Sequence, residues 1–341
     1  FMEVVGIDIG GANIKAASTC GFVQNVPFPM WARHEALSEI LVDVLRQAPQ
    51  TEYLAVTVTG ELADCFESKE AGVKYILDSL CKADARKARV YCTNGDWKTP
   101  AEACACSATV AASNWHALAR FAHALHAKSD ASSLILDIGS TTVDVVPVIK
   151  GAPVFDGATD MDRLQNKSLV YAGIQRTPVC SIVNTLPFRS RNIPVARELF
   201  ATTEDAFVIL GDLPEDSECT DMADGMPRTK TAAKDRLARM VCACPSDVTD
   251  EDAKLMAEAI AESLTLLITQ AIESQQSQHQ LDTLLCTGHG GFLLSRIQEK
   301  LNVPINTSSL GNCLTPEQLR CAPALAVAKL LQQHLVAKSL S

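Results

Sequence analysis

The chain has 341 residues, of which 47% are hydrophobic and 21% are charged, a composition typical of a globular protein of one or two domains with an ample core. The formal net charge of −10 argues against a nucleic-acid partner, although a loop and its metal can neutralise an anionic small ligand locally. Apolar runs stay below the roughly 18 residues that a membrane span needs, so we expect no membrane partner.

The 13 cysteines are an odd number, and no secretory signal precedes the first predicted strand. We therefore expect reduced thiols and a cytoplasmic location. The pairs Cys104/Cys106 and Cys242/Cys244 have C-x-C spacing, and no C-x-x-C occurs, which argues against a zinc site.

The first predicted elements, within residues 4–17, read VVGIDIGGANIKAA and indicate two buried strands joined by a tight turn. Asp8 precedes the turn, and a carboxylate at a strand end can hold Mg²⁺ through water. Glycine lets the backbone approach a ligand closely, and exposed backbone N–H groups suit phosphate oxygens. The candidate phosphate ligands of this turn are Gly10, Gly11, Asn13 and Lys15.

Residues 33–48 show the apolar spacing of a helix that packs on a sheet, and residues 54–59 predict a β-branched strand. Glu61 and Asp64 follow that strand, at the edge where open α/β sheets place ligands. Helix capping explains the same pair equally well. A further strand, residues 89–93, precedes Asp96, and from Pro100 an Ala-rich helix is predicted through about residue 127.

Residues 134–148, LILDIGSTTVDVVPV, repeat the first pattern. A plain hairpin with a Gly-Ser turn would look similar, but Asp137 aligns with Asp8 at a separation of 129 residues, about one domain length. Such a duplication predicts two similar α/β domains that face one cleft. Gly139, Ser140, Thr141 and Thr142 are the candidate phosphate ligands of the second turn, and Asp144 is a nearby carboxylate.

Residues 151–231 are rich in Pro, Gly, Asp and Arg and lack a clear period, which indicates either a functional segment or an insertion that braces the fold. Helices are then predicted over residues 229–241 and, after a Thr249-x-x-Asp252 capping box, up to about residue 278. The last buried strand is expected at residues 281–287 and a C-terminal helix at 322–335.

The duplicated loops resemble the two phosphate loops of the actin, sugar-kinase and heat-shock-ATPase superfamily. Its third element, a Gly-rich loop for adenosine after a late strand, is matched by residues 284–293, which adds Gly288 and Gly290 as phosphate-side candidates. The resemblance implies two duplicated actin- or ribonuclease-H-like α/β domains around a central cleft. The first would comprise residues 2–130 with 322–341, and the second residues 131–321, with 151–231 as an irregular insertion on the substrate side.

Several segments resemble a narrower group, similar to hydantoinases and oxoprolinases, found beside tetrahydromethanopterin-linked one-carbon genes in methanogens and methylotrophic bacteria. These segments include TGELADCF, NGDW, AASNW, LVYAGIQRTPVC, ELFATTEDA and ADGMPRTKTAAKDRLARM. The archaeal members are methanofuran-biosynthesis enzymes that join the phenol oxygen of γ-glutamyltyramine to an aminomethyl-furan-methyl diphosphate and release pyrophosphate. The chain departs from the group at Met222, Cys244 and Gly291, and the last departure weighs against ATP at the third loop.

This resemblance implies a transferase with small-molecule substrates. Mg²⁺ would be held through water by Asp8 and Asp137, and both phosphate loops would hold the diphosphate. The phenol, with an unperturbed pKa near 10, needs a base. The candidate bases are Asp144, Glu61, Asp64, Asp96 and Asp224. The candidate substrate-binding residues are Tyr171, Arg176, Thr177, Asp224 and Arg228, with Arg176 or Arg228 matching the glutamyl carboxylates.

Two other functions stay open. In a kinase or ATPase of the same superfamily, Asp144 or another cleft carboxylate would activate an acceptor hydroxyl or water, and stoichiometric ADP would form. In a non-catalytic switch, ATP would close two domains around a partner, with slow hydrolysis and a stable protein complex. The oligomeric state stays open as well.

Overall fold

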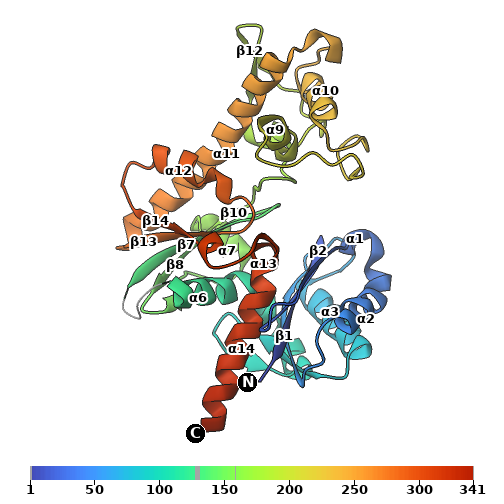
Figure 1. Ribbon diagram of the computed structural model, residues 1–341, viewed down its shortest axis with the longest axis vertical. Helices are drawn as coiled ribbons and strands as arrows, with labels where there is room; N and C mark the ends of the chain where they lie inside the picture. Colours follow the sequence, from blue (N-terminus) through green and yellow to red (C-terminus); the bar gives the residue numbers. More distant parts are fainter. Residues whose placement is uncertain (1, 127–130, 158, 341) are drawn as a thin grey trace.

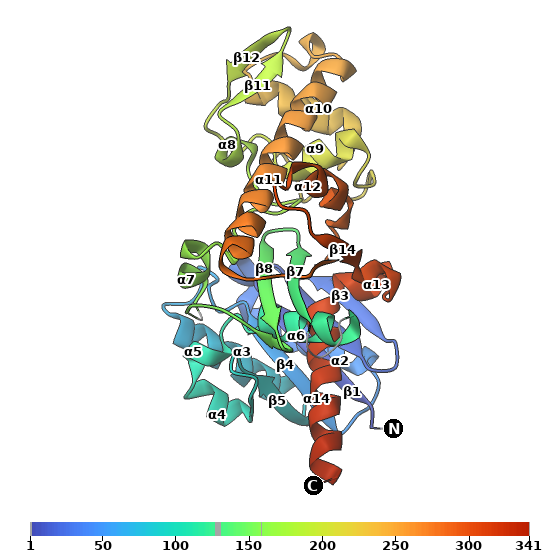
Figure 2. The ribbon, with the colours of Figure 1, turned by 90° about the vertical axis from the view of Figure 1, so that its left-hand side faces the viewer.

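The computed structural model describes residues 2–126, 131–157 and 159–340 of the chain. It is elongated, with a sheet at each of two levels and a largely helical region at one end (Figure 1). Two helices lie between the two sheets. One of them, the C-terminal helix, extends to the end of the molecule opposite the helical region (Figure 2).

The first sheet has the strand order β3-β2-β1-β4-β5-β6. Its strands are β1 (Val4–Gly10), β2 (Asn13–Ser18), β3 (Val23–Pro27), β4 (Tyr53–Thr59), β5 (Lys87–Tyr91) and β6 (Trp97–Lys98). The first three form an antiparallel meander, and β4 and β5 run parallel to β1. The carboxyl ends of β1 and β4 therefore meet at one edge, and in the β1–β2 hairpin Asp8 stands opposite Lys15.

Helices cover both faces of this sheet. One face carries α2 (Leu37–Gln47) and α3 (Lys69–Ala83), preceded by α1 (Met30–Arg33) and the turn η1 (His34–Ala36). The other face carries α6 (Asn114–His126) and α14 (Ala322–Leu340). The predicted return of the C-terminal helix to the first sheet is confirmed, because α14 packs along β1, β2 and β4.

The prediction of one continuous Ala-rich helix from Pro100 is wrong. The segment forms α4 (Pro100–Cys104), α5 (Ser107–Val110) and α6, interrupted at Ala112, whose φ is +50°. There the backbone leaves the helix to pair with β4, since the Ala112 amide donates to the Val58 carbonyl at 2.9 Å. Alanine's helix propensity is a weak preference that such tertiary pairing overrides. The break places the start of α6 at the edge where β4 ends.

The second sheet repeats the hairpin of the first. Its strand order is β10-β8-β7-β13-β14, with β9 paired to β8. The strands are β7 (Ser132–Ile138), β8 (Val143–Ile149), β9 (Ala152–Pro153), β10 (Leu169–Val170), β13 (Thr283–Thr287) and β14 (Asn306–Ser309). In the β7–β8 hairpin Asp137 stands opposite Asp144. Strand β14 follows the strand that was expected to be last, because its polar sequence NTSS lacks the apolar signal of a buried strand.

The second sheet is also covered on both faces. On one face, alternate residues of β7 and β8 pack against α11 (Asp250–Gln278) and α12 (Leu294–Lys300). On the other face, the residues between them pack against α6, so α6 contacts both sheets. The remaining connections are η2 (Pro245–Asp247), η3 (Gly291–Leu293), η4 (Leu310–Asn312) and α13 (Pro316–Arg320).

The irregular segment 151–231 is largely folded. It forms α7 (Asp160–Gln165), α8 (Val179–Ile182), the hairpin β11 (Thr185–Phe188) with β12 (Arg191–Pro194), and α9 (Thr203–Leu210). With α10 (Lys230–Met240) and part of α11, the segment from α8 onward builds a separate core at the upper end of Figure 1. Short elements of this kind leave no sustained period in the sequence, which is why pattern analysis did not find them.

Helix α11 begins with the predicted capping box, in which Thr249 and Asp252 bond each other's backbone amides. By length and composition alone it would be long and apolar enough to cross a membrane. However, 56% of its most apolar stretch is buried inside the protein, where it packs against α9, α12 and the second sheet. The helix therefore serves as a core element of this fold.

The packing of α14 on β1 depends on Gly6, because a Cβ at this position would overlap the Ala324 carbonyl oxygen. We expect Gly6→Ala to lower the free energy of unfolding by at least about 2 kcal/mol, since overpacking forces backbone shifts. Gly291→Ala is the matched control, because its Cβ would meet its nearest neighbour, the Cys286 Sγ, at 3.9 Å. Denaturant unfolding of the two variants measures the difference, and equal midpoints would contradict this packing constraint.

Candidate active site

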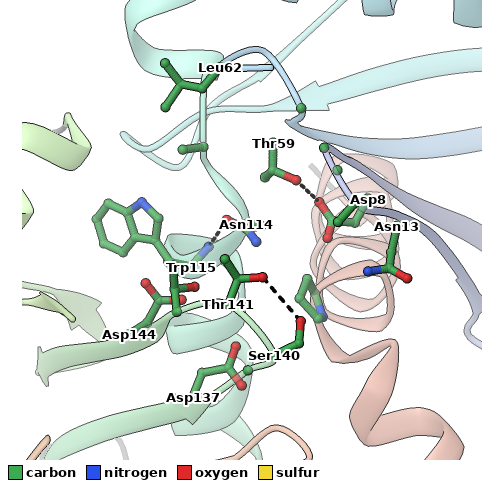
Figure 3. Close-up of a pocket in the computed structure, with 18 of the residues that line it drawn as sticks. Asp8, Asn13, Thr59, Leu62, Asn114, Trp115, Asp137, Ser140, Thr141 and Asp144 are labelled. Carbon is green, nitrogen blue, oxygen red and sulfur yellow. Dashed lines mark hydrogen bonds between the residues drawn. The ribbon is translucent and has the colours of Figure 1, made fainter. Parts of the chain in front are cut away.

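A cleft of about 410 Å³ lies where the two hairpin turns face each other. Figure 3 shows Asp8 of the first sheet and Asp137 of the second approaching the same space from separate strands. All of the predicted residues of the first turn, Gly10, Gly11, Asn13 and Lys15, line this cleft. So do Gly139, Ser140, Thr141 and Thr142 of the second turn. The duplication therefore brings both predicted loops together.

Asp8 is held rigidly at the end of β1. Its Oδ1 accepts hydrogen bonds from the hydroxyls of Thr57 and Thr59, both at 3.0 Å, and its side chain is 3% exposed. Burial raises the pKa of Asp8, while Lys15 and the two hydroxyls act in the opposite direction. A carboxylate in this position gains from any cation that enters the cleft.

Asp137 is the counterpart of Asp8 in the second hairpin. Burial raises its pKa to about 7, and the neighbouring charge of Asp144 contributes in the same direction, as does Asp8. Lys15 lowers the pKa of Asp137, as it does that of Asp8, so the charge of this lysine acts on both hairpin carboxylates. The charge of Asp8 therefore disfavours ionisation of Asp137.

The third Gly-rich loop closes one side of the cleft through Gly288 and His289. Gly288 has φ +80°, and a Cβ there would stand 2.5 Å from the Asp137 Oδ1. Both the left-handed backbone conformation and the lack of space therefore exclude a side chain at this position. Gly290 instead packs beneath the hairpin, with its amide donating to the Ile138 carbonyl at 3.0 Å. It shapes the loop and does not line the cleft.

His289 joins the cleft to the α8–α10 region by hydrogen bonds. Gln175 donates its Nε2 amide to Glu204 at 2.8 Å, which leaves the Gln175 Oε1 to accept from the His289 Nε2 at 3.3 Å. Glu204 in turn accepts from Arg228 at 3.0 Å. Burial, with Lys15 and Arg320, lowers the pKa of His289 to about 4, so the ring is neutral and its Nδ1 is an acceptor.

Glu61 is the most enclosed of the predicted carboxylates beyond β4. Its side chain is 2% exposed and lines the cleft, and its Oε2 lies buried without a hydrogen-bond partner among the residues that the structure describes. Burial raises the pKa of Glu61 to about 7. Asp64, on the same loop, also lines the cleft but is exposed.

Asp144 is paired with an arginine that the sequence analysis did not select. The Arg163 Nη2 lies 2.5 Å from the Asp144 Oδ1, and its Nη1 lies 3.5 Å from Asp160. The guanidinium also stacks over Trp115 at 4.2 Å from the ring centroid. Because Arg163 is 2% exposed, this ion pair is sheltered from solvent, and it fixes Asp144 in the wall of the cleft.

The mouth of the cleft carries exposed apolar side chains. Leu62, Trp31 and Tyr171 are 51%, 44% and 60% exposed and all line the cleft. The Arg176 guanidinium stacks over Trp31 at 4.9 Å from the ring centroid, which links the second half of the molecule to the first across the mouth. The Arg176 backbone amide is anchored to the second phosphate turn, since it donates to the Ser140 carbonyl at 3.0 Å.

Besides Gly290, four predicted site residues lie outside the cleft, and we withdraw them from the candidate site. Asp96 accepts from Asn94 at 2.8 Å in the turn between β5 and β6. Thr177 is buried and accepts from the Gly173 amide, which stabilises the loop before α8. Asp224 binds Arg236 and Arg239 near α10, and Arg228 is already paired with Glu204 and Asp216. Each of these side chains is thus engaged elsewhere in the fold, away from the cleft.

The cleft also contains residues that the sequence analysis missed. They are Trp31, Leu62, Asn114, Trp115, Asp160, Arg163, His289 and Arg320. Asn114 and Trp115 belong to the AASNW segment, which carried the family resemblance without a role for either residue. Arg320 is carried by α13, far from both phosphate loops in sequence, and gave no local signal.

The donor set fits a magnesium ion that is only partly coordinated by protein. Within residues 2–126, 131–157 and 159–340, no group of three or more His, Cys, Asp or Glu side chains is arranged to hold a metal. Mg²⁺ keeps several waters and is commonly bound by one or two carboxylates together with phosphate oxygens. Asp8 and Asp137, two buried carboxylates with raised pKa values, are the residues that would hold such an ion.

Comparisons with known proteins agree with this geometry. Residues 52–334 match the hydantoinase/oxoprolinase family. The chain is 34% identical over 335 residues to the (4-{4-[2-(gamma-L-glutamylamino)ethyl]phenoxymethyl}furan-2-yl)methanamine synthase of Methanocaldococcus jannaschii, covering 97% of this chain and 98% of that protein. The synthase of the same name from Methanococcus vannielii is 26% identical over 211 residues, which is 61% of this chain and 95% of that protein.

Among solved structures, the fold is similar to that of a ROK family glucokinase from Streptomyces griseus in complex with glucose and AMPPNP. The TM-score is 0.51 at 12% identity, and the match covers 97% of this chain and 99% of the glucokinase. The predicted fold class, two actin- or sugar-kinase-like α/β units around a cleft, is confirmed.

The burial of Glu61 has a consequence for stability. Its pKa is raised from 4.5 to about 7, so the native state loses stability as the pH rises through this window, where the carboxylate must ionise while buried. Glu61→Gln removes that ionisation. We expect it to raise the free energy of unfolding by up to about 3 kcal/mol at pH 8.5 and by little at pH 4.5.

Denaturant unfolding of wild type and variant at the two pH values measures this effect. Asp64→Asn is the matched control, because this exposed carboxylate of the same loop has no burial to relieve. A Glu61→Gln variant that gained no stability at pH 8.5 would contradict the enclosed, unpartnered position of Glu61.

Proposed function

The chain belongs to the hydantoinase/oxoprolinase family and, within it, to the methanamine synthases, and from this membership we propose that it is a transferase of methanofuran-type cofactor biosynthesis. It would join the phenol oxygen of γ-glutamyltyramine to the methylene carbon of an aminomethyl-furan-methyl diphosphate and release pyrophosphate. The observation that supports the proposal most strongly is the position of the two hairpin turns. They face each other, in an arrangement suited to phosphate oxygens, next to a cleft mouth lined by aromatic side chains.

The hairpin turns suit the diphosphate end of the donor. Ser140, Thr141 and Thr142 offer hydroxyls, and Lys15 and Arg320 offer positive charge in the same cleft. Mg²⁺ held through water by Asp8 and Asp137 would supply further charge neutralisation for the departing pyrophosphate. Positive charge directed at the leaving group lowers the barrier because charge develops there in the transition state.

The reaction is balanced without an outside reductant or energy source. The bond between the methylene carbon and the diphosphate oxygen breaks, and its electron pair leaves with pyrophosphate. An electron pair of the phenol oxygen forms the new ether bond, and the phenol proton passes to a base. The furan ring stabilises positive charge at the methylene, so a dissociative displacement fits this donor. ATP has no part in this bond exchange.

The cleft mouth suits the acceptor. Leu62, Trp31 and Tyr171 present apolar and aromatic surface to a flat phenol ring, although they stand partly in water in the free protein. Arg176 lies over Trp31, and its planar fork matches the carboxylates of the glutamyl group. The phenol end would then point inward, toward the buried carboxylates.

A pyrophosphate-release assay tests the proposed function. Purified protein receives the furan-methyl diphosphate, γ-glutamyltyramine and Mg²⁺ without ATP. We expect pyrophosphate and the aryl ether, identified by mass spectrometry, in equal amounts. If neither forms, and ADP accumulates once ATP and an acceptor are added, the synthase is excluded in favour of a kinase. Stable ATP binding with very slow hydrolysis would indicate a switch protein.

In this assay, Asp8→Asn and Asp137→Asn should each lower kcat by at least about 100-fold, because each removes a charge that the diphosphate and its metal require. Both changes keep the side-chain shape and relieve a buried charge, so the fold should be retained. Asp96→Asn is the control, since Asp96 lies in the β5–β6 turn outside the cleft, and it should behave as wild type. Wild-type rates for both cleft variants would eliminate the two-loop site.

Arg176→Ala should raise KM for γ-glutamyltyramine at least about 10-fold while changing KM for unmodified tyramine little, because only the former carries carboxylates. Arg176→Lys keeps the charge and should show an intermediate effect, since lysine lacks the planar fork. Steady-state kinetics with both acceptors measure the discrimination. Equal effects on the two acceptors would rule out recognition of the glutamyl group by Arg176.

A further inference from the structure

The structure separates the candidate bases that sequence alone could not rank. We propose that Glu61 is the residue that takes the proton from the acceptor phenol during ether formation, an assignment that rests on the proposed function. The decisive observation concerns Glu61, a residue that lines the cleft and whose buried Oε2 has no hydrogen-bond partner within the described part of the chain. A buried carboxylate oxygen without a partner is costly, and here it remains available to a ligand.

The backbone around Glu61 is fixed by packing. Glu61 follows β4 directly after Gly60, and helix α3 approaches so closely that a Cβ on Gly72 would stand 2.5 Å from the Glu61 carbonyl oxygen. The residue therefore lies in the turn that follows a central strand, where its backbone is held against a helix of the first unit. A general base requires such fixed placement, since proton transfer demands hydrogen-bond distance.

Three of the other cleft carboxylates, Asp8, Asp144 and Asp160, are already engaged. The Asp8 Oδ1 accepts from Thr57 and Thr59, and Asp144 is bound by Arg163 at 2.5 Å. Asp160 faces the same guanidinium at 3.5 Å. Each of these groups has a partner that competes for its charge or its lone pairs.

Two carboxylates in the cleft differ from Glu61 in their surroundings. Asp137 stands beside Lys15 and against the third loop at Gly288, on the phosphate side of the cleft. Asp64 is exposed to water, which would compete for its lone pairs. Glu61 precedes Leu62, which belongs to the apolar mouth where the acceptor ring is expected. It thus combines enclosure with closeness to the acceptor.

The charges that face Glu61 favour a base that works near neutral pH. Burial dominates, and Asp160 of α7 and Asp8 of β1 also raise its pKa, whereas Lys69 at the start of α3 lowers it. The resulting pKa of about 7 leaves a large fraction ionised at neutral pH while giving more basicity than an exposed carboxylate has. The phenol becomes more acidic as its oxygen bonds to carbon, so the transfer is coupled to ether formation.

The proton balance of the step is complete. The phenol O–H bond breaks and its proton passes to the Glu61 carboxylate, while the oxygen electron pair forms the bond to the methylene carbon. Pyrophosphate leaves with the electron pair of the broken carbon–oxygen bond. Glu61 then returns the proton to solvent before the next turnover.

Acceptors of different acidity test this assignment with Glu61→Gln. A tyramine ring with fluorine atoms beside the hydroxyl has a more acidic phenol, which is ionised at the assay pH and needs no base. We expect Glu61→Gln to lower kcat about 100-fold or more with γ-glutamyltyramine, which is within the range that general base catalysis supplies. With the fluorinated acceptor, the loss of kcat in the variant should be at least about 10-fold smaller. In the wild-type protein, kcat/KM should change with pH near 7, and this pH dependence should be absent in the variant.

Glu61→Asp is a second variant, in which a carboxylate is retained at a shorter reach, and it should fall between wild type and Glu61→Gln. Near-wild-type activity of Glu61→Gln with γ-glutamyltyramine would overturn the assignment, with the proposed function intact. Equal loss with both acceptors would also overturn it and assign a positioning role to Glu61. If wild-type protein makes no ether with either acceptor, the proposed function fails, and the assignment fails with it.

Discussion

The structure depends on one electrostatic constraint, the convergence of buried carboxylates on a single cleft. Asp8 and Asp137 reach it from equivalent hairpins, and burial raises the pKa of each, with Lys15 acting against the rise in both. Removing carboxylates from water without full pairing destabilises the fold, so the surrounding packing must supply the difference. The two sheets, with α6 and α14 between them, provide that packing and hold the two hairpins face to face.

This arrangement explains why the cleft suits an anionic donor in a protein with a net charge of −10. Lys15, Arg320 and any metal on the hairpin carboxylates would offset negative charge locally in the cleft, whatever the overall composition. Arg163 differs from Lys15 and Arg320. Its guanidinium is enclosed between Asp144 and Trp115 and stabilises the wall of the cleft. Glu61 also lines the cleft, and its buried Oε2 has no hydrogen-bond partner among the described residues.

The cleft is also connected to the α8–α10 region at the far end of the molecule. The hydrogen bonds from His289 through Gln175 to Glu204 and Arg228 join the third loop to that region. The same region begins with the loop that carries Arg176 across to Trp31. The irregular segment is therefore part of the construction of the cleft mouth as well as a brace for the second sheet, and both interpretations of its sequence describe part of its role.

The sequence by itself determined the duplicated strand–turn–strand pattern, the two Gly-containing turns that face one cleft, the capping box of α11 and the family, because these depend on local spacing and on glycine and hydroxyl residues near one another in the chain. It could not rank Glu61 above Asp96 or Asp224, since each is a carboxylate after a turn or strand and only tertiary contacts reveal which is already paired. It did not find the break at Ala112, because helix propensity is local and the pairing with Val58 is not. The tertiary structure alone decided which polar groups are satisfied by the fold and which remain free for a substrate, because burial and pairing join residues distant in sequence.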